Sequence, residues 1–403
     1  MSLPDVVVVG AARTPIGRYG GAFKDVHPAE LGAVATRAAL ERADLRPERV
    51  DEVIVGHARQ AGSGPNPGRQ VGRRAGVPDS VPAQTLNKAC ASGLQAIAAG
   101  AQSILLGESQ VVVAGGIESM SRMPYLVDAS DARWGHRMGN FTFVDAMYRD
   151  GFTCSLSGMI MGETAEVLAR QYGITREESD AYALETQRRA GIAIAEGRFT
   201  REIAPVAVAD AKGRATMVEA DEHPRLETTI EQLKKLAPVF GNVDGQPGII
   251  TAGTSSGITD GGAAVVLMNA AAAAADGIAP LARIIGWASA GVDPRIMGIG
   301  PVPAMRTLFQ RTGLTLNDFD LVELNEAFAP QVLAVLRDEP IPPEKLNVNG
   351  GAIALGHPIG CTGTRIVVTL LYEMIRRSVR RGLATLCVSG GMGMAMAIER
   401  SEP

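Results

Sequence analysis

Short β-branched runs alternate with alanine-rich helical segments in the first part of the chain, and this alternation limits the possible folds most. Residues 6–9 and 53–55 indicate buried strands, residues 29–43 indicate a helix between them, and residues 111–116 indicate a third strand after a second helix. Strands separated by helices form right-handed crossovers in a mostly parallel sheet that is covered on both faces. We therefore expect an α/β fold built on such a sheet.

The last third of the chain repeats this pattern. Strands are expected at residues 281–287, 320–324, 384–388 and 394–399, and helices at residues 301–313, 329–337 and 363–376. A cysteine, a helix and a strand that ends in a glycine pair occur in both halves, beginning at Cys90 and at Cys361. The repetition predicts two duplicated α/β domains related by a pseudo-twofold axis.

A different pattern separates the two repeats. Between residues 121 and 249 charged residues are dense, long apolar strands are missing, and helices are expected at residues 161–170 and 175–196. The second helix opens with Thr175 and Glu178, which have the spacing of a capping box. This segment is expected to be an inserted loop domain.

The sheet pattern resumes at residues 262–268, and a polyalanine stretch at residues 270–275 indicates a boundary. These limits predict an N-terminal domain of residues 1–120 plus 250–278, an inserted loop domain of residues 121–249, and a C-terminal domain of residues 279–403.

Charge and composition exclude several classes of function. A net charge of −4 provides no basic surface for nucleic acid, and no apolar run reaches the roughly 18 to 20 residues that a membrane span needs. The N-terminus has no basic region followed by a long apolar segment, as a secretory signal would have. Four scattered cysteines provide neither a disulfide framework nor a CxxC metal site. We therefore expect free thiols, no metal and a cytoplasmic enzyme.

Cys90 follows an extended segment and directly precedes a predicted helix. The positive end of a helix dipole and its free N–H groups stabilise a thiolate, the nucleophilic form of cysteine. Its small neighbours Ala91, Ser92 and Gly93 favour access to the thiol over packing. A buried inert cysteine is the commoner alternative for a cysteine taken at random, but these neighbours favour a nucleophile.

His357 lies between two glycine-rich turns in the stretch from Asn347 to Cys361. The glycines permit positive φ and allow the imidazole to approach whatever lies opposite. The alternative is a tight crossover from strand to helix whose histidine satisfies a neighbour. That alternative is favoured for an isolated histidine, but other chemically active residues in this chain favour a contact role.

Three other positions follow strands or lie in loops. Cys387 ends a strand that runs into a glycine turn, at the edge where open α/β sheets keep their sites; a core strand residue is the alternative. Asn325 also follows a strand, and it can orient water or donate to an oxyanion, or simply cap the next helix. Ser255 and Ser256 suit an amide or phosphate ligand, although a plain loop is the commoner alternative.

Taken together, four motifs closely resemble those of the thiolase family in order and spacing, from about residue 5 to residue 400. They are Cys90-Ala-Ser-Gly93, Asn325-Glu-Ala-Phe328, Asn349-Gly-Gly-Ala-Ile-Ala-Leu-Gly-His357-Pro and Cys387-Val-Ser-Gly-Gly-Met-Gly393, and Ala11-Ala-Arg-Thr-Pro-Ile-Gly17 also looks like that family. The resemblance implies thiolase-like duplicated α/β domains in α-β-α-β-α layers, with the inserted loop domain covering coenzyme A.

The resemblance also implies a reaction, the reversible Claisen condensation of acetyl-CoA with an acyl-CoA or the thiolytic cleavage of a 3-oxoacyl-CoA. Cys90 would form the acyl-enzyme, His357 would accept its proton, and Cys387 would be the acid and base at the α-carbon. Asn325 would fix a water that forms an enolate oxyanion hole with His357. Backbone N–H groups of Cys90 and Ser389 would form a second hole. Coenzyme A thioesters are the substrates of such an acyltransferase, and no cofactor is implied.

The same resemblance implies contacts with coenzyme A at Ser256, Arg225, Met161, Phe152, Ala252 and Gly253. Ile160 departs from the family patterns, in which histidine or proline often stands before this methionine. The acyl-chain preference therefore stays open. Ser389 stands where glycine is usual, but only its N–H group is used.

Two other functions stay open. A decarboxylating condensing enzyme of the ketoacyl synthase type shares the duplicated fold but usually lacks the second cysteine. A thiolase-like protein that binds acyl-CoA without turnover is the other alternative, and the intact Cys90, His357, Cys387 and Asn325 count against it. The resemblance also implies a homodimer or homotetramer, with the loop at residues 121–149 as a candidate tetramer contact.

Overall fold

A continuous sheet runs through the protein and joins its two halves. The structure is a computed structural model that describes residues 5–209 and 213–400. The strands of the sheet, in spatial order, are β14 (Leu321–Leu324), β15 (Arg381–Val388), β16 (Met392–Glu399), β13 (Ala282–Gly291), β1 (Val6–Arg13), β12 (Thr259–Asn269), β5 (Val111–Ser119), β3 (Glu52–His57) and β4 (Ala83–Leu86). A short strand, β2 (Gly17–Arg18), also pairs with β12.

The two halves of the sheet meet where β1 pairs with β13, and the strand directions repeat on either side of this junction. In the N-terminal half, the parallel pair β3 and β5 is followed by the antiparallel strands β12 and β1. In the C-terminal half, the parallel pair β14 and β15 is followed by the antiparallel strands β16 and β13. The repeated order confirms the predicted duplication.

The prediction of a mostly parallel sheet is wrong. Parallel pairing joins β3 to β4 and β5, and β14 to β15, whereas the other neighbours in the sheet are antiparallel. The reason lies in connections that contain no crossover helix. The tight turn at residues 389–391 joins β15 directly to β16, which requires antiparallel pairing. Likewise, β12 reaches the sheet only after the long insert, so its direction was not evident from the pattern.

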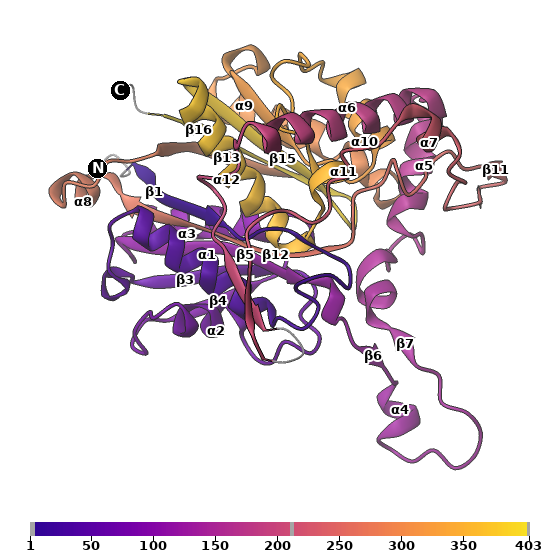
Figure 1. Cartoon of the computed structure of the whole chain (residues 1–403), viewed down its shortest axis with the longest axis horizontal. Helices are drawn as coiled ribbons and strands as arrows, with labels where there is room; N and C mark the ends of the chain where they lie inside the picture. Colours follow the sequence, from indigo (N-terminus) through magenta and orange to yellow (C-terminus); the bar gives the residue numbers. More distant parts are fainter. Residues whose placement is uncertain (1–4, 210–212, 401–403) are drawn as a thin grey trace.

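Helices and the two halves of the sheet form five layers (Figure 1). In the middle, α3 (Ser92–Leu105) and α12 (Ile359–Arg377) pack against each other. The first packs against the N-terminal half of the sheet, and the second packs against both halves. The outer helices are α1 (Pro28–Arg42) and α2 (Pro67–Arg74) on the N-terminal half, and α9 (Pro301–Thr312) and α10 (Ala329–Asp338) on the C-terminal half. The α-β-α-β-α arrangement implied by the resemblance is confirmed.

Glycines let the two central helices approach each other closely. A Cβ on Gly363 of α12 would lie 2.3 Å from the backbone nitrogen of Leu94 in α3. A Cβ on Gly93 would lie 2.7 Å from Thr364 Oγ1. Real Cβ atoms do not come this close to other heavy atoms, so only glycine fits at both positions. The contact places the N-terminal ends of α3 and α12 side by side.

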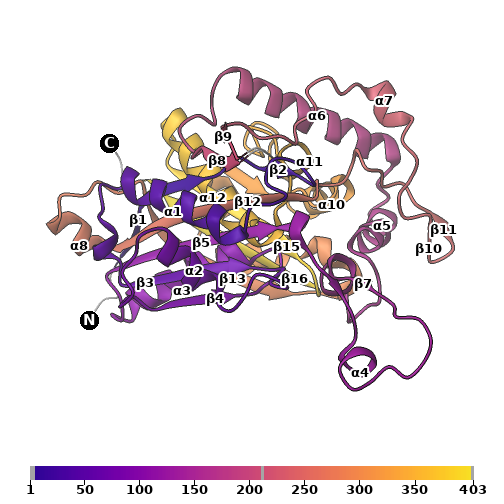
Figure 2. The same ribbon diagram turned by 60° about the horizontal axis from the view of Figure 1, so that its bottom comes forward.

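The insert differs from both domains. Its first part carries α4 (Ala129–Ala132), β6 (Tyr125–Leu126) and β7 (Val144–Asp145), and it projects away from the rest of the molecule (Figures 1 and 2). Its second part contains α5 (Met161–Gln171) and α6 (Arg176–Ala195), and α6 packs on α10 and on α11 (Ala352–Leu355). The predicted capping box is confirmed, because the side chains of Thr175 and Glu178 each accept the other's backbone N–H.

Shorter helices and strand pairs, together with short 3₁₀ and π-helical turns, complete the described chain. The former are α7 (Ile230–Lys234), α8 (Ala270–Ala275) and the strand pairs β8 (Val206–Ala209) with β9 (Ala215–Val218) and β10 (Asn242–Val243) with β11 (Gln246–Pro247). The polyalanine stretch forms α8, between β12 and β13. The predicted domain limits at residues 1 and 403 lie outside the described residues. Within the described part of the chain, no helix is both long enough and apolar enough to span a bilayer.

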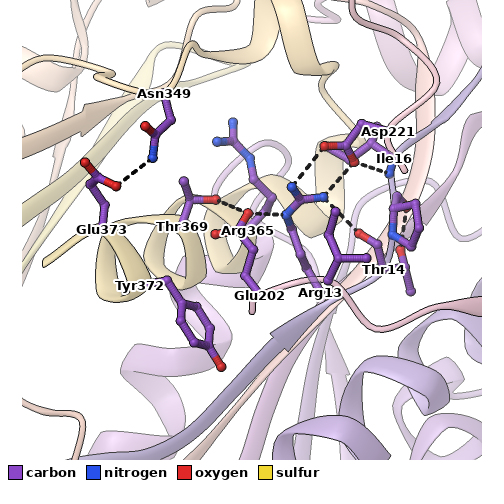
Figure 3. A network of polar contacts seen from close by, with 12 residues as sticks. Arg13, Thr14, Ile16, Glu202, Asp221, Asn349, Arg365, Thr369, Tyr372 and Glu373 are labelled. Atoms are coloured by element: carbon purple, nitrogen blue, oxygen red, sulfur yellow. Dashed lines mark hydrogen bonds and ion pairs between the residues drawn. The ribbon is translucent and has the colours of Figure 1, made fainter. Parts of the chain in front are cut away.

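A buried polar network joins the insert to β1 and α12 (Figure 3). Arg13 at the end of β1 donates to Glu202 Oε1 at 2.6 Å and to both carboxylate oxygens of Asp221 at 2.7 and 2.9 Å. Thr369 of α12 donates to the same oxygen of Glu202 at 3.1 Å, and the N–H of Ile16 donates to Asp221 at 2.8 Å. The side chains of the arginine and of both carboxylates are only 1% exposed. Arg13, the arginine of the N-terminal motif, thus connects β1 to the insert through buried ion pairs.

Candidate active site

Cys90 lies in a constrained turn between β4 and α3. Ala89, just before it, has a φ of 45°, which is left-handed and uncommon for a residue with a side chain. Two side chains hold this conformation: Asn87 Oδ1 accepts the N–H of Ala89 at 2.8 Å, and Ser92 Oγ donates to the carbonyl of Ala89 at 2.7 Å. Cys90 is partly exposed, whereas the other three cysteines are buried.

The thiol of Cys90 is protonated at rest. Its surroundings bury the sulfur enough to raise the pKa of Cys90, although Arg59 and the backbone N–H groups of Ser389 and Cys90 act in the opposite direction. The expectation that the helix end stabilises a thiolate therefore needs correction. The N–H groups that bond the sulfur belong to Ser389 and to Cys90 itself, and they do not outweigh desolvation. A neighbouring base is needed to remove the proton.

His357 lies in the turn between α11 and α12. Gly356 before it has a φ of 103°, and a Cβ there would lie 2.5 Å from Thr259 Cγ2, so glycine is required. The backbone N–H of His357 donates to the carbonyl of Gly257 at 3.1 Å. The turn is fixed by these contacts, and His357 is only 6% exposed.

The bonds of the imidazole define its tautomer. Nδ1 lies 2.7 Å from Thr362 Oγ1, and this hydroxyl donates its single hydrogen to the carbonyl of Pro358 at 3.0 Å. The hydroxyl oxygen therefore accepts a hydrogen bond from Nδ1–H, which leaves the lone pair on Nε2. Burial, with smaller effects from Arg365 and Arg59, lowers the pKa of His357 to about 3. The ring is neutral at physiological pH, and Nε2 can accept a proton.

Cys387 lies near the end of β15, as predicted, and is 1% exposed. The chain then turns through Gly390 and Gly391, which have φ values of 86° and 84°. Burial raises the pKa of Cys387 strongly, and the nearby Cys90 raises it further. The second thiol is therefore also protonated at rest, which is the form of a general acid.

The structure brings the two cysteines and the histidine turn to one region. Cys387 is close enough to Cys90 for their charges to interact, and the N–H that follows in the same turn, that of Ser389, bonds the Cys90 sulfur. Ile359, two residues after His357, packs in the same apolar cluster as Cys90. The adjacent N-terminal ends of α3 and α12 thus carry the nucleophile candidate and the base candidate together.

Asn325 follows β14 and is 1% exposed. Its backbone N–H donates to the carbonyl of Thr385 at 3.0 Å, which ties it to β15 two residues before Cys387. Its side-chain oxygen and nitrogen have no hydrogen-bond partner within the described residues. The residue is not a helix cap, because α10 begins at Ala329 and its N-cap is Phe328. A buried amide with both polar atoms free is suited to holding a polar partner.

Comparison with known proteins identifies the family. Residues 6–271 match the thiolase N-terminal domain, and residues 278–400 match the thiolase C-terminal domain. The chain belongs to the thiolase family. The acetyl-CoA acetyltransferase of Pseudomonas aeruginosa is 50% identical over 398 residues, which are 99% of this chain and 100% of that protein. The acetyl-CoA acetyltransferase of Escherichia coli is 49% identical over the same shares of the two chains.

Solved structures agree with this assignment. The acetyl-CoA acetyltransferase of Bacillus anthracis has a TM-score of 0.95 at 44% identity, over 99% of this chain and 100% of that chain. Human mitochondrial 3-ketoacyl-CoA thiolase in complex with CoA has a TM-score of 0.93 at 43% identity, over 99% and 98% of the two chains. This thiolase is therefore an acyltransferase.

Phe152 and Met161 of the thiolase lie beside the two cysteines. Phe152 packs against the apolar cluster that Cys90 contacts, and Met161 packs against the cluster that contains Cys387. Both residues are partly exposed, so each can also contact a substrate. Ile160, the position that departs from the family patterns, is partly exposed at the N-terminus of α5.

The other residues implied for coenzyme A lie in the second part of the insert and in the loop that follows it. Ala252, Gly253 and Ser256 belong to the loop before β12, and the N–H of Ser256 donates to the carbonyl of Ala327 at 3.0 Å. This bond places Ser256 beside the turn that follows Asn325. Arg225 is exposed, and its N–H donates to the side chain of Gln187 on α6.

Sequence patterns did not reveal the role of Glu326, next to Asn325. Its buried carboxylate accepts hydrogen bonds from Tyr182 and Thr186 of α6, from the side chain of Asn347 and from the N–H of Ile353, at 2.8 to 3.1 Å. These donors belong to α6 and to the segment that leads to His357. The glutamate thus joins three segments around the site, and only its position after a strand was visible in the sequence.

Proposed function

We propose that this thiolase transfers acyl groups between acetyl-CoA and an acyl-CoA through a covalent Cys90 acyl-enzyme. The observation that carries the proposal is the meeting of two protonated thiols with a neutral imidazole whose Nε2 is free to accept a proton. The names of the relatives, acetyl-CoA acetyltransferase and 3-ketoacyl-CoA thiolase, support this substrate class. Coenzyme A thioesters are substrates in this proposal, and no cofactor takes part.

In the first half-reaction, the Cys90 proton moves to His357 Nε2 while the sulfur attacks the thioester carbonyl. The carbon–sulfur bond to coenzyme A breaks, and the proton on Nε2 passes to the departing thiolate. The N–H groups of Cys90 and Ser389, which already bond the Cys90 sulfur, are candidates to stabilise the carbonyl oxygen as it gains charge. Each such donor typically contributes about 10² to 10³ in rate.

In the second half-reaction, the Cys387 proton first moves to His357 Nε2, and the resulting thiolate takes a proton from the α-carbon of acetyl-CoA. The enolate that forms attacks the acyl group on Cys90. A carbon–carbon bond forms, and the carbon–sulfur bond to Cys90 breaks. The Nε2–H of His357 can donate a hydrogen bond to the enolate oxygen, and the free amide of Asn325 can hold a water for the same purpose. The proton on Nε2 finally passes to the released Cys90 sulfur, which restores the resting thiols. In the reverse direction the resting protonated form of Cys387 is already the required acid.

The remaining contacts follow from the same proposal. Phe152 and Met161 would contact the acyl and pantetheine portions beside the thiols, and Ala252, Gly253 and Ser256 would line the pantetheine path. Arg225 would meet the nucleotide end of coenzyme A at the exposed side of α6. We also propose a cytoplasmic location, which the four free thiols support.

Thiolysis of 3-oxoacyl-CoA substrates tests the proposal. We expect acetoacetyl-CoA and free CoA to yield two equivalents of acetyl-CoA. A series of longer 3-oxoacyl-CoA substrates is then compared by chromatography of the products. Ile160 removes a polar contact without forming a defined pocket, so the series measures a preference that the residues leave open. Malonyl-thioester-dependent condensation without thiolysis would instead support the ketoacyl synthase alternative. CoA affinity without any turnover would support a binding protein.

The projecting part of the insert supports a further proposal, a homodimer or homotetramer. Trp134, Met138 and Phe143 on this part are 78%, 90% and 67% exposed, which is unusual for large apolar side chains on a monomer. Deletion of residues 131–138 is expected to give a smaller species in sedimentation velocity while thiolysis continues, because this loop lies away from the thiols. An unchanged sedimentation coefficient would show that the loop is not part of the interface between subunits. As a control, Leu106→Ser changes an exposed apolar residue on the body and should leave the assembly unchanged.

A further inference from the structure

A buried arginine outside the four motifs lies beside the candidate site. Arg59 follows the end of β3 by two residues and is 6% exposed. Its Nη1 donates to the carbonyl of Asp150 at 3.1 Å, and its Nε has no hydrogen-bond partner. No carboxylate among the described residues lies within 4 Å of its guanidinium. A buried cation without a paired anion is costly, so its position calls for a function.

The segment that carries Arg59 is bonded to the turn of His357. Glu118 accepts the N–H of Arg59 on one carboxylate oxygen at 3.2 Å and the N–H of Gly360 on the other at 2.9 Å. Gly360 belongs to the first turn of α12, three residues after His357. A Cβ at this glycine would lie 2.7 Å from the nitrogen of Ala58, so the two segments are in direct contact.

The same segment is bonded to the turn of Cys90. Asn87 donates from Nδ2 to the carbonyl of Ala58 at 3.0 Å and accepts the N–H of Ala89 at 2.8 Å. Ala58 and Cys90 also pack in one apolar cluster. The backbone that carries Arg59 is thus bonded to both the turn of Cys90 and the turn of His357.

Other charged or titratable groups around the thiol cannot replace this cation. Glu118 raises the pKa of Cys90 instead of lowering it, and His57 Nε2 lies 3.1 Å from the carboxylate of Glu118. Lys88 donates to Gln95 and Ser289. Cys387 and His357 also lie near Cys90, and both are uncharged at rest.

The cation next to the imidazole differs from Arg59 in its pairing. Arg365 acts on His357, but its guanidinium lies 3.4 Å from the carboxylate of Glu323. Arg59 acts on both reactive groups: it lowers the pKa of Cys90 against the effect of burial, and it lowers the pKa of His357. A nearby positive charge favours an anion and disfavours a second cation.

We propose that Arg59 is a positioning residue that favours the thiolate of Cys90 and prevents His357 from retaining the proton that it receives. The sulfur–hydrogen bond of Cys90 breaks, the proton passes to Nε2, and the unfavourable imidazolium then releases it to the departing thiolate of coenzyme A. The inference rests on the proposed function, because it takes Cys90 as the nucleophile.

The pH dependence of Cys90 alkylation by iodoacetamide tests this inference without any thioester. The rate at Cys90 is followed by mass spectrometry of its peptide, which separates it from the three buried cysteines. In Arg59→Met the midpoint should move to higher pH, and alkylation at pH 7 should slow by about threefold to tenfold, because removal of a cation raises the pKa of a thiol. Arg59→Lys keeps the charge and should stay close to the unmodified protein.

Matched variants separate this effect from a structural one. Arg170→Met also removes an arginine with an unbonded buried nitrogen, but one on α5 that lies 3.7 Å from Asp244, and it should leave the midpoint unchanged. If Arg59→Met does not fold, Arg59→Gln provides the neutral variant, with thermal melting to confirm folding. An unchanged midpoint in a folded neutral variant, or an equal shift in Arg59→Lys, would overturn the inference. A normal shift in a protein that lacks thiolysis would leave it intact and overturn the proposed function alone.

Discussion

Cys90→Ala is expected to abolish the enzyme-bound label in a single-turnover reaction with radiolabelled acyl-CoA, whereas Cys387→Ala should still become labelled. The first variant lacks the only sulfur that lies in the strained, partly exposed turn. The second keeps this sulfur, the base and the N–H groups of Ser389 and Cys90. It lacks the proposed acid and base at the α-carbon, a role that typically contributes about 10² to 10⁴ in rate. Cys387→Ala should therefore accumulate the acyl-enzyme and fail to condense it with acetyl-CoA.

Cys361→Ala is the matched control for this pair. Its thiol is close to His357 in sequence, but it is 1% exposed within α12, and burial raises its pKa to about 12. It should complete both half-reactions. Labelling of Cys90→Ala at a normal rate, or loss of labelling in Cys387→Ala, would contradict the assigned roles.

Replacement of Arg13 by methionine should give the largest loss of stability among single substitutions outside the active site. The variant leaves the carboxylates of Glu202 and Asp221 buried without their cation, and breaking a buried ion pair on one side costs about 3 to 5 kcal/mol. The loss is measured as the change in the free energy of unfolding by urea. An exposed pair provides the comparison: Arg295→Met removes one of the two arginines beside Asp244 and should cost less than about 1 kcal/mol.

The pH dependence of the Arg13→Met variant follows from the same network. Burial already raises the pKa of Glu202, and Arg13 opposes this rise. Without Arg13 the folded carboxylate binds a proton more readily than the unfolded one, so stability falls as pH rises through the raised pKa. The deficit of the variant should therefore be smaller at pH 5 than at pH 8. Glu202→Gln in the Arg13→Met background should recover part of the loss, and an equal deficit at both pH values would contradict the explanation.

Much of the local structure was predictable because it depends on neighbouring residues. The capping box of α6, the strand that carries Cys387 and its glycine turn all depend on contacts within a few residues. The start of α12 was less predictable. The helix begins at Ile359, whereas the prediction placed its start near residue 363. The prediction was late because glycines lower helix propensity in isolation. Here Gly360 and Gly363 are instead required by the close packing against β5 and α3.

The candidate site shows the same division. Cys90, His357, Cys387 and Asn325 were identified from motifs, and their roles stay predictions for the labelling experiment to test. Arg59 and Glu326 were not identified, because neither carries a local signal. Their importance depends on donors and acceptors that come from distant segments, which only folding brings together.

The sequence by itself determined the family, the duplicated α/β layers and the identity of the thiols and the imidazole, because motif order and residue type are properties of the chain alone. Tertiary structure decided the directions of the strands, the protonated state of both thiols, the tautomer of His357 and the free amide of Asn325. These depend on burial and on contacts between residues that are far apart in the chain. Such contacts set the local electrostatics and the supply of hydrogen-bond partners, and no run of neighbouring residues specifies them.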